Sequence, residues 1–317
     1  MTAPSPKAAV IVVLYNSRAV VRSCLDGLQA TRYPELEVVV VDNASSDDAL
    51  ELARAHPLRP RVIRSEINRG WAGGNNLGIV AALGAGAEYI TVLNPDVDLT
   101  PDWLRDAVTL MEADRSIAML DFEGLDGSAS AVGEPSRPPL RGTDVPAAIG
   151  AALVVRVSAL RRIGPIDERY FLYFEDTDWS LRALRAGFRV VRLNRALGHK
   201  PETSSSDRHK LLRAWLSIRN SILMHLKHKR RELPGWLWIL VRHALSRREL
   251  SYAHLHRLRP YGPARNLVLV GAAALWNLIH LPATLASLRR ERRYRDEGWS
   301  PLDDGAGTLV PATAAHR

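Results

Sequence analysis

Two acidic clusters are the parts of this chain whose residue types and spacing best fit catalytic chemistry. The first is Asn94-Pro95-Asp96-Val97-Asp98, and the second is Glu175-Asp176-Thr177-Asp178. Carboxylates two residues apart in extended backbone point to the same side, so Asp96 and Asp98 can reach one cation. Hard divalent ions such as Mg²⁺ or Mn²⁺ prefer oxygen ligands, and such an ion would neutralise charge on a departing diphosphate.

The first cluster also fits a turn before a helix, with Asp98 or Thr100 as the cap and Pro101 at the first helical position. The two interpretations are compatible, because Thr100 can cap the helix while Asp96 binds a metal.

The second cluster follows an aromatic run at 170–174. Acids crowded beside aromatic side chains can have a raised pKa, which a general base requires, and Asp176 with Glu175 is the candidate pair. Carboxylates in the first turn of a helix are also favourable for dipole reasons alone. His199 lies downstream of the next predicted strand, where a neutral imidazole can complete a metal site.

Two further segments are candidates for substrate binding. Asp42 stands where the second predicted strand ends, and a carboxylate there can accept hydrogen bonds from a base or ribose; the serines at 45–46 fit a helix cap instead. The segment 68–78 places glycines and amides around a helix start, where backbone N–H groups and Arg69 can approach phosphate. Its spacing is not the dinucleotide fingerprint, and a simple turn is the alternative.

The elements that must position these residues alternate between strand and helix from residue 8 to about 121. Short β-branched runs predict buried strands at 10–14, 38–41, 61–63 and 89–93. Helices are predicted at about 17–30, 46–56, 73–85 and 101–113. This alternation predicts an α/β fold with a mostly parallel sheet, in which ligands bind at the carboxyl ends of the strands.

The second half of the chain is less regular. Glycine and proline at 122–146 predict a long irregular connection, after which regular structure resumes at 147–155. A helix is predicted at about 175–186, ending at Gly187, followed by a strand at 188–191. From 208 onward the pattern is helical.

The net charge of +9 is regional. Residues 208–295 carry +16, which leaves −7 for the rest of the chain. Such a basic segment, rich in Trp and Leu, suggests contact with anionic lipid headgroups or nucleic acid, and a solvated helical face is the alternative. The single cysteine, Cys24, excludes an intramolecular disulfide framework and favours a reducing compartment. The N-terminus is interpreted as a first strand, not a signal peptide.

The most apolar late stretch, 267–288, is marginal for a membrane-spanning helix because Asn277, His280 and Pro282 interrupt it. Its basic flanks and Trp276 fit an interfacial helix equally well, and a buried hairpin helix is the third interpretation.

These segments, in this order, resemble family 2 glycosyltransferases, particularly the bacterial rhamnosyltransferase-like branch. The most specific match is 164–178, with support from 13–17, 41–45, 68–78 and 93–96. The match covers about residues 8–200. It implies a GT-A catalytic domain at 1–206, with a nucleotide-sugar half at about 8–121 and an acceptor half at about 147–206. Residues 207–317 would form a basic helical region that associates with the membrane.

The resemblance also implies roles for individual residues. Asp42 would contact the donor nucleotide, Asp96 would hold the metal, Asp176 would deprotonate the acceptor, and His199 resembles a metal ligand of some relatives. Family register makes Asn94 and Asp96 the equivalents of the usual Asp-x-Asp pair, which ranks Asp96 above Asp98. The other residues expected at the substrate site are Tyr15, Asn16, Asn68, Arg69, Gly70, Asn75 and Asn94.

The leading hypothesis is therefore an inverting, metal-dependent hexosyltransferase, with rhamnose as one candidate sugar. Its donor would be a nucleotide-diphosphate sugar, and its acceptor would be a cell-envelope or polyprenyl-linked glycan. The protein would act at the cytoplasmic face of the cell membrane, which it would contact peripherally. A catalytically silent nucleotide-sugar scaffold of an envelope complex is the alternative. Nucleic-acid binding by the basic tail is a third hypothesis, and no nucleic acid is expected as a partner.

Overall fold

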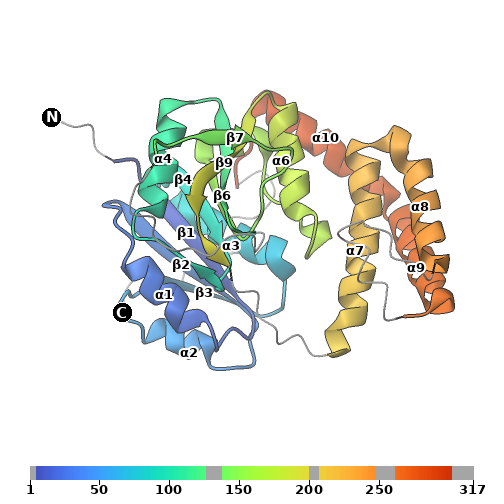
Figure 1. Ribbon diagram of the computed structural model, residues 1–317, viewed down its shortest axis with the longest axis horizontal. Helices are drawn as coiled ribbons and strands as arrows, with labels where there is room; N and C mark the ends of the chain where they lie inside the picture. Colours follow the sequence, from blue (N-terminus) through green and yellow to red (C-terminus); the bar gives the residue numbers. More distant parts are fainter. Residues whose placement is uncertain (1–4, 126–137, 200–206, 247–260, 302–317) are drawn as a thin grey trace.

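The computed structural model describes residues 5–125, 138–199, 207–246 and 261–301. These residues form an α/β domain beside a bundle of helices (Figure 1). The strands are β1 (Ala8–Leu14), β2 (Leu36–Asn43), β3 (Arg61–Ser65), β4 (Tyr89–Leu93), β5 (Val97–Asp98), β6 (Ile117–Glu123), β7 (Gly142–Asp144), β8 (Ala152–Arg156), β9 (Arg189–Ala196) and β10 (Gly198–His199).

The helices of the α/β domain are α1 (Val21–Gln29), α2 (Ala49–Arg54), α3 (Gly70–Gly84), α4 (Trp103–Ala113), α5 (Val157–Ile163) and α6 (Glu175–Arg185). Those of the C-terminal part are α7 (Asp207–His228), α8 (Leu233–Leu245), α9 (Pro263–Ile279) and α10 (Leu281–Glu297). Two short 3-10 turns, Glu168–Tyr170 and Arg230–Glu232, complete the described helical structure.

The larger sheet has the strand order β3-β2-β1-β4-β8-β6-β9-β7. The strands from β3 to β4 are parallel, and β8 runs antiparallel to both of its neighbours. The predicted mostly parallel sheet is therefore confirmed, as is the α/β class. Helices α1, α2 and α4 cover one face of this sheet, while α3, α5 and α6 cover the other.

Among the elements that were not predicted are β6, α5 and the short strand β7, which lies inside the supposed irregular connection. Strand β6 was not predicted because Asp121 interrupts the apolar run from which a buried strand is recognised. Asp121 is fully buried because Arg192 on β9 binds both of its carboxylate oxygens, at 3.0 and 2.6 Å. A partner 71 residues away leaves no trace in the periodicity of β6.

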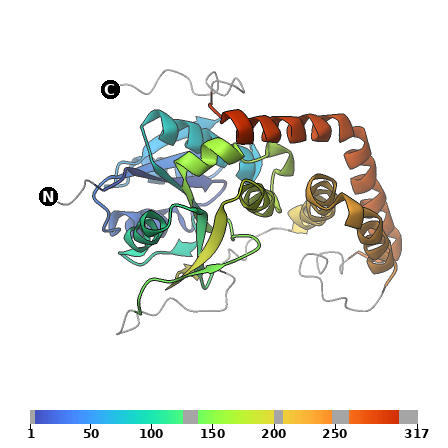
Figure 2. The same cartoon turned by 90° about the horizontal axis from the view of Figure 1, so that it is seen from above.

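The C-terminal helices are not a detached appendage. Helices α7, α8 and α9 share a small apolar core around Ile222, Leu240 and Val270. Helix α10 then leaves this bundle and runs back along the α/β domain (Figure 2), where Tyr294 and the following Trp299 join the core beside α3, α5 and α6. The helical prediction from 208 onward is confirmed for the residues that the structure describes.

The stretch 267–288 is divided between α9 and α10, which are bent by 59° at their junction. Within the described residues no single helix is long and apolar enough to cross a bilayer; only this bent pair has the length and composition.

Candidate active site

Strands β1, β2 and β4 end at the same edge of the sheet. Leu14, the last residue of β1, lies opposite Asp42 near the end of β2, and Leu93 ends β4 beside β1. The carboxyl edge of parallel strands is where α/β folds bind ligands. Residues that follow these three strands therefore face one region, as the sequence predicts for the nucleotide-sugar half.

Asp42 is 1 % exposed and only partly satisfied by the protein. Its Oδ1 accepts a hydrogen bond from the Ser45 N–H at 3.2 Å. Its Oδ2 lies 3.9 Å from Nε of Arg64 and accepts no hydrogen bond from the described residues. A buried carboxylate oxygen without a donor is costly, so a ligand hydroxyl or N–H at this position would be favourable. This geometry supports Asp42 as a donor-site residue.

Tyr15 and Asn16 have different surroundings. The Tyr15 side chain is 45 % exposed and so accessible to a ligand. Asn16 adopts a positive φ of 53°, and its Oδ1 accepts hydrogen bonds from the N–H and the hydroxyl of Ser46. Asn16 thus joins the ends of β1 and β2, and both Tyr15 and Asn16 are exposed to solvent.

The segment 68–70 forms a turn that Asn43 holds in place. Asn43 Nδ2 donates to Asn68 Oδ1 at 3.1 Å and to the Gly70 carbonyl at 2.9 Å. Asn43 Oδ1 accepts the N–H of Arg69 at 2.9 Å. Asn43 on β2 therefore shapes the start of α3, a role that the local sequence does not reveal.

The first N–H groups of α3 do not face the phosphate side as expected. The N–H groups of Trp71 and Ala72 both donate to the carbonyl of Phe171, at 2.7 and 3.3 Å. Gly70 permits this contact, because a Cβ there would lie 2.3 Å from the Phe171 oxygen. The expectation of a phosphate at these two N–H groups is corrected: the glycine serves a close approach between α3 and the loop before Glu175.

Asn75 lies inside α3. It is 1 % exposed, and its Nδ2 donates to the carbonyl of Trp71 at 2.9 Å. Its Oδ1 is buried and accepts no hydrogen bond from the described residues, and the substrate role of Asn75 stays a prediction. Arg69 remains half-buried at the helix start, with Nε 3.3 Å from the Ser65 hydroxyl.

The first acidic cluster follows β4 directly. The N–H of Asn94 donates to the Ala151 carbonyl at 2.7 Å, and its Oδ1 accepts the indole N–H of Trp71 at 2.9 Å. Asp96 is half-buried, whereas Asp98 is exposed on β5. These contacts fix Asn94 against α3 and leave Asp96 and Asp98 as the carboxylates of the cluster.

His199 enters the same region through a two-stranded ladder. Strand β10 pairs antiparallel with β5, which sets the backbone of His199 opposite Val97. By side-chain type, two carboxylates and an imidazole suit Mn²⁺ or Mg²⁺, and a divalent metal at Asp96 stays a prediction.

The second acidic cluster meets the first through Gly150 and Trp71. Asp176 Oδ2 accepts the Gly150 N–H at 3.1 Å, and Oδ1 accepts the Thr177 N–H at 2.6 Å. A Cβ on Gly150 would lie 3.1 Å from the Trp71 ring and 3.3 Å from Cβ of Asp176. Since Trp71 also holds Asn94, the two clusters stand side by side at one site, although 80 residues separate Asp96 from Asp176. Trp71 and Gly150 were not predicted as site residues.

The remaining acids of the second cluster, Glu175 and Asp178, have pKa values that are shifted in opposite directions. Burial, followed by the charges of Asp176 and Asp178, raises the pKa of the Glu175 carboxyl well above its usual range. Glu175 Oε2 is buried without a hydrogen-bond partner among the described residues, which fits a protonated side chain. Burial thus favours the neutral form of Glu175 beside Asp176.

Asp178 belongs to a buried ionic cluster and not to the site. Burial favours its neutral form, but Lys227, Arg182 and His228 together hold its pKa well below the usual range. Lys227 Nζ lies 2.6 Å from Asp178, 2.8 Å from Asp167 and 2.7 Å from Glu291. These three carboxylates have metal-like spacing, yet the ammonium group of Lys227 is the cation that they surround.

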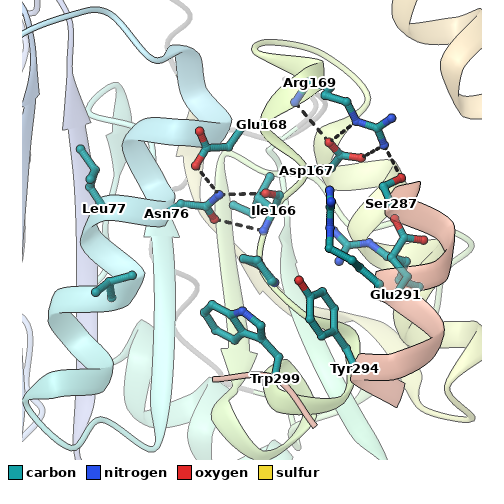
Figure 3. Close-up of a pocket in the computed structure, with 14 residues that line it drawn as sticks. Asn76, Leu77, Ile166, Asp167, Glu168, Arg169, Ser287, Glu291, Tyr294 and Trp299 are labelled. Atoms are coloured by element: carbon teal, nitrogen blue, oxygen red, sulfur yellow. Dashed lines mark hydrogen bonds and ion pairs between the residues drawn. The ribbon is translucent and has the colours of Figure 1, made fainter. Parts of the chain in front are cut away.

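A cavity of about 460 Å³ lies near this cluster, between α3, residues 165–169 and α10 (Figure 3). Asn76 bridges its wall, since it donates to the Ile166 carbonyl at 2.8 Å and accepts the Ile166 N–H at 3.0 Å. Its lining includes none of Asp42, Asp96 and Asp176. The cavity is therefore separate from the candidate active site.

Comparison with known proteins identifies the first half of the chain. Residues 9–164 match the model of the Glycosyl transferase family 2. The chain is 27 % identical over 199 residues to the low-salt glycan biosynthesis hexosyltransferase Agl10 of Haloferax volcanii, which covers 57 % of this chain and 63 % of that protein. It is 27 % identical to the putative glycosyltransferase EpsE of Bacillus subtilis, over 80 % of this chain and 92 % of the relative.

A third relative, the succinoglycan biosynthesis protein ExoO of Rhizobium meliloti, is 32 % identical over 61 % of this chain and 56 % of its own length. The chain thus spans less than two thirds of the first and third of these relatives.

Two solved structures share the fold with a TM-score of 0.50. One is the mannosyltransferase PcManGT from Pyrobaculum calidifontis in complex with GDP-Man and Mn²⁺, at 19 % identity, covering 92 % of this chain and 82 % of that one. The other is residues 1–349 of Staphylococcus aureus TarS in complex with UDP, at 18 % identity, covering 94 % and 92 %. The expected GT-A fold is confirmed. The family match ends at 164, before Asp176.

Proposed function

The chain belongs to glycosyltransferase family 2 and has the GT-A fold, and on this premise we propose that it is an inverting glycosyltransferase that uses a nucleotide-diphosphate sugar. The observation that carries this proposal is the meeting of the two acidic clusters through Trp71 and Gly150. A donor-side carboxylate, Asp96, and a candidate base, Asp176, thereby border one site at the edge of the sheet.

In the proposed reaction the acceptor hydroxyl oxygen attacks the anomeric carbon of the donor sugar. Its proton passes to the carboxylate of Asp176, which the N–H groups of Gly150 and Thr177 orient. The bond between the anomeric carbon and the diphosphate oxygen breaks, and its electron pair leaves with the nucleoside diphosphate. Attack from the face opposite the leaving group inverts the anomeric configuration.

Asp96, with Asp98 or His199, would hold a divalent metal at this site. Such an ion supplies charge neutralisation for the leaving diphosphate when bound. Asp42 would accept a hydrogen bond from the nucleoside, which would satisfy its buried Oδ2. The PcManGT complex contains GDP-Man and Mn²⁺ and the TarS complex contains UDP, which supports a donor of this class. A hexose is the proposed sugar, and rhamnose is one candidate, which comes from the resemblance to the rhamnosyltransferase-like branch.

The proposed acceptor is a cell-envelope or polyprenyl-linked glycan, reached by peripheral contact at the cytoplasmic face of the membrane. Six large apolar side chains are exposed on α9 and α10: Leu267, Val268, Leu275, Leu278, Ile279 and Leu285. No Asp, Glu, Lys or Arg occurs between Arg265 and Arg289. Contiguous exposed apolar surface marks an interaction site, and its arginine flanks favour an anionic lipid surface.

The donor part is tested by a thermal-shift screen of nucleotide sugars, including GDP-mannose, UDP-N-acetylglucosamine and dTDP-rhamnose, each with and without Mn²⁺. The stabilising donor is then offered to Asp176→Asn, which should bind it as the wild type does but lose transfer. Asp296→Asn, on the exposed end of α10, is the matched control and should stay active. An active Asp176→Asn protein would remove Asp176 as the base, and binding without any turnover by the wild type would favour the silent scaffold.

The membrane part is tested by flotation with phosphatidylglycerol vesicles and with neutral phosphatidylcholine vesicles. The protein should float with the anionic vesicles, and Leu275→Asp on α9 should weaken this. Leu184→Asp changes a leucine on α6 that is 38 % exposed, against 57 % for Leu275, and this variant should float as the wild type does. Retention of DNA without flotation, or dimers formed through this face without lipid, would contradict the proposal.

A further inference from the structure

The loop that precedes the second acidic cluster has a strained backbone. Phe171, Tyr173 and Phe174 all have positive φ values, of 61°, 77° and 71°. Bulky residues avoid this region, and such conformations persist only where surrounding contacts over-determine them. Helix α6 starts at Glu175, directly after these residues. Something outside the loop must therefore hold the backbone that presents Asp176.

The carbonyl groups of this loop show what holds it. Asn220 on α7 is fully buried, and its Nδ2 lies 2.8 Å from each of the carbonyl oxygens of Tyr170, Leu172 and Tyr173. Arg219 donates to the carbonyls of Arg169 and Tyr170, at 2.6 and 2.9 Å. The fifth carbonyl, that of Phe171, accepts the N–H groups at the start of α3. Every carbonyl from 169 to 173 thus accepts a hydrogen bond from another element.

The orientation of these two side chains is fixed in turn by the helical bundle. Arg219 Nε donates to Asn220 Oδ1 at 2.8 Å, which points the Asn220 amino group at the loop. The Arg219 guanidinium carbon lies 4.4 Å from the centre of the Trp276 ring on α9 and 5.1 Å from that of Trp215. Asn277 on α9 donates to the backbone carbonyl of Arg219 at 2.9 Å. A side chain locked by such neighbours can position a catalytic group accurately.

Helix α7 also binds the chain on the far side of Asp176. Lys227 and His228 contact Asp178 Oδ1 at 2.6 and 2.8 Å. Helix α7 therefore holds the chain on both sides of Asp176. It binds the loop carbonyls before Asp176 and the carboxylate of Asp178 after it. Helix α7 lies beyond residue 164, where the family match ends.

We propose that Arg219 and Asn220 are positioning residues, which hold the strained loop so that Asp176 meets the acceptor hydroxyl. This inference rests on the proposed function of Asp176 as the base. The C-terminal helices then complete the active site, and the predicted catalytic domain at 1–206 does not contain everything that transfer requires. The two helix starts, α3 from the donor half and α6, are held in one geometry by the same loop.

The test compares Asn220→Asp with Asn266→Asp in the full-length protein, using the donor found by the thermal-shift screen. Both substitutions place a carboxylate at a buried asparagine of the helical bundle, but only Asn220 donates to the carbonyls of the loop. Asn220→Asp should lower kcat by on the order of 10²-fold, as misplacement of a catalytic group by about 1 Å does. KM for the donor should stay within twofold, and the acid limb of the pH profile of kcat should move. Asn266→Asp should keep kcat near the wild type at a temperature where both variants are folded.

Hydrogen exchange gives a readout that does not depend on turnover. In Asn220→Asp the amides of residues 170–176 should exchange faster, while those of β4 should not. If Asn220→Asp does not fold, Arg219→Lys replaces it, because lysine keeps the charge but loses the planar fork.

The outcomes separate this inference from the function on which it rests. An active Asp176→Asn protein would remove the base and the positioning role together. An inactive Asp176→Asn beside an Asn220→Asp variant of normal kcat would overturn the positioning role alone. Equal losses of kcat in Asn220→Asp and Asn266→Asp would also overturn it, because the effect would then be general damage to the bundle.

Discussion

Replacement of Gly70 by alanine should lower both the stability of the protein and its transfer activity. The causes are the positive φ of Gly70 and its close contact with Phe171. Gly70 has a φ of +68°, which costs an L-residue about 1 kcal/mol. Its Cβ would also lie 2.3 Å from the Phe171 oxygen and 2.6 Å from that ring. Relief of such overpacking costs about 1–3 kcal/mol, and each of the hydrogen bonds from Trp71 and Ala72 contributes about 0.5–1.5 kcal/mol. We expect a total loss of stability of about 3–7 kcal/mol.

Gly86 offers a control that isolates the backbone part. It has a similar φ of +80° just beyond the end of α3, but a Cβ there would meet nothing within 4 Å. Gly86→Ala should therefore cost only about 1 kcal/mol and leave transfer intact. Gly84→Ala, at the end of α3 with open space around it, should be neutral or slightly stabilising.

The assay is urea unfolding of the three variants, together with donor transfer at a temperature where all are folded. Gly70→Ala should unfold at the lowest urea concentration and lose most transfer, because the displaced Phe171 carbonyl carries the loop before Asp176 with it. If Gly70→Ala and Gly86→Ala lose the same stability, the contact between α3 and the loop is not the source of the effect. If Gly70→Ala keeps full activity, the loop does not position the base.

Three other changes have expected outcomes. Lys227→Met should destabilise the protein by about 3–5 kcal/mol in urea unfolding, since it strands buried carboxylates, whereas Lys229→Met removes an exposed pair and should cost under about 1 kcal/mol. The pKa of Glu175 is raised in the folded state. Its contribution to the free energy of unfolding therefore falls as the pH rises above the pKa of about 4.3 that Glu175 has in the unfolded chain, by at most about 1.4 kcal/mol per pH unit. Glu175→Gln should therefore gain stability over the wild type as unfolding is measured from pH 5 to pH 8, and a constant difference would contradict the raised pKa. Trp71→Phe removes the 2.9 Å hydrogen bond to Asn94 and should raise the donor KM severalfold, while unchanged kinetics would show that this bond does not organise the site.

The sequence predicts the nucleotide half of the fold well because its signals are local. Runs such as 10–14 and 38–41 are β-branched and buried on both faces, and they became β1 and β2. Polar residues that follow such strands must lie at the carboxyl edge of a parallel sheet, which placed Asp42 and Asp96 correctly before any tertiary contact was known. Asp176 was found as part of a motif, in a helix start that the pattern also predicts.

The tertiary structure alone decided how these parts meet. Asn75 belongs to α3, the first N–H groups of that helix bind the Phe171 carbonyl, and Asp178 faces Lys227. Each of these contacts except the first joins residues about 50 to 100 positions apart, and periodicity carries no information on such pairings. For the same reason the sequence did not predict the proposed positioning role of Asn220. In the sequence, Asn220 is one polar residue within a long basic helix. The two acidic clusters were evident from residue types, but the role of each carboxylate depends on the buried partners that the fold supplies.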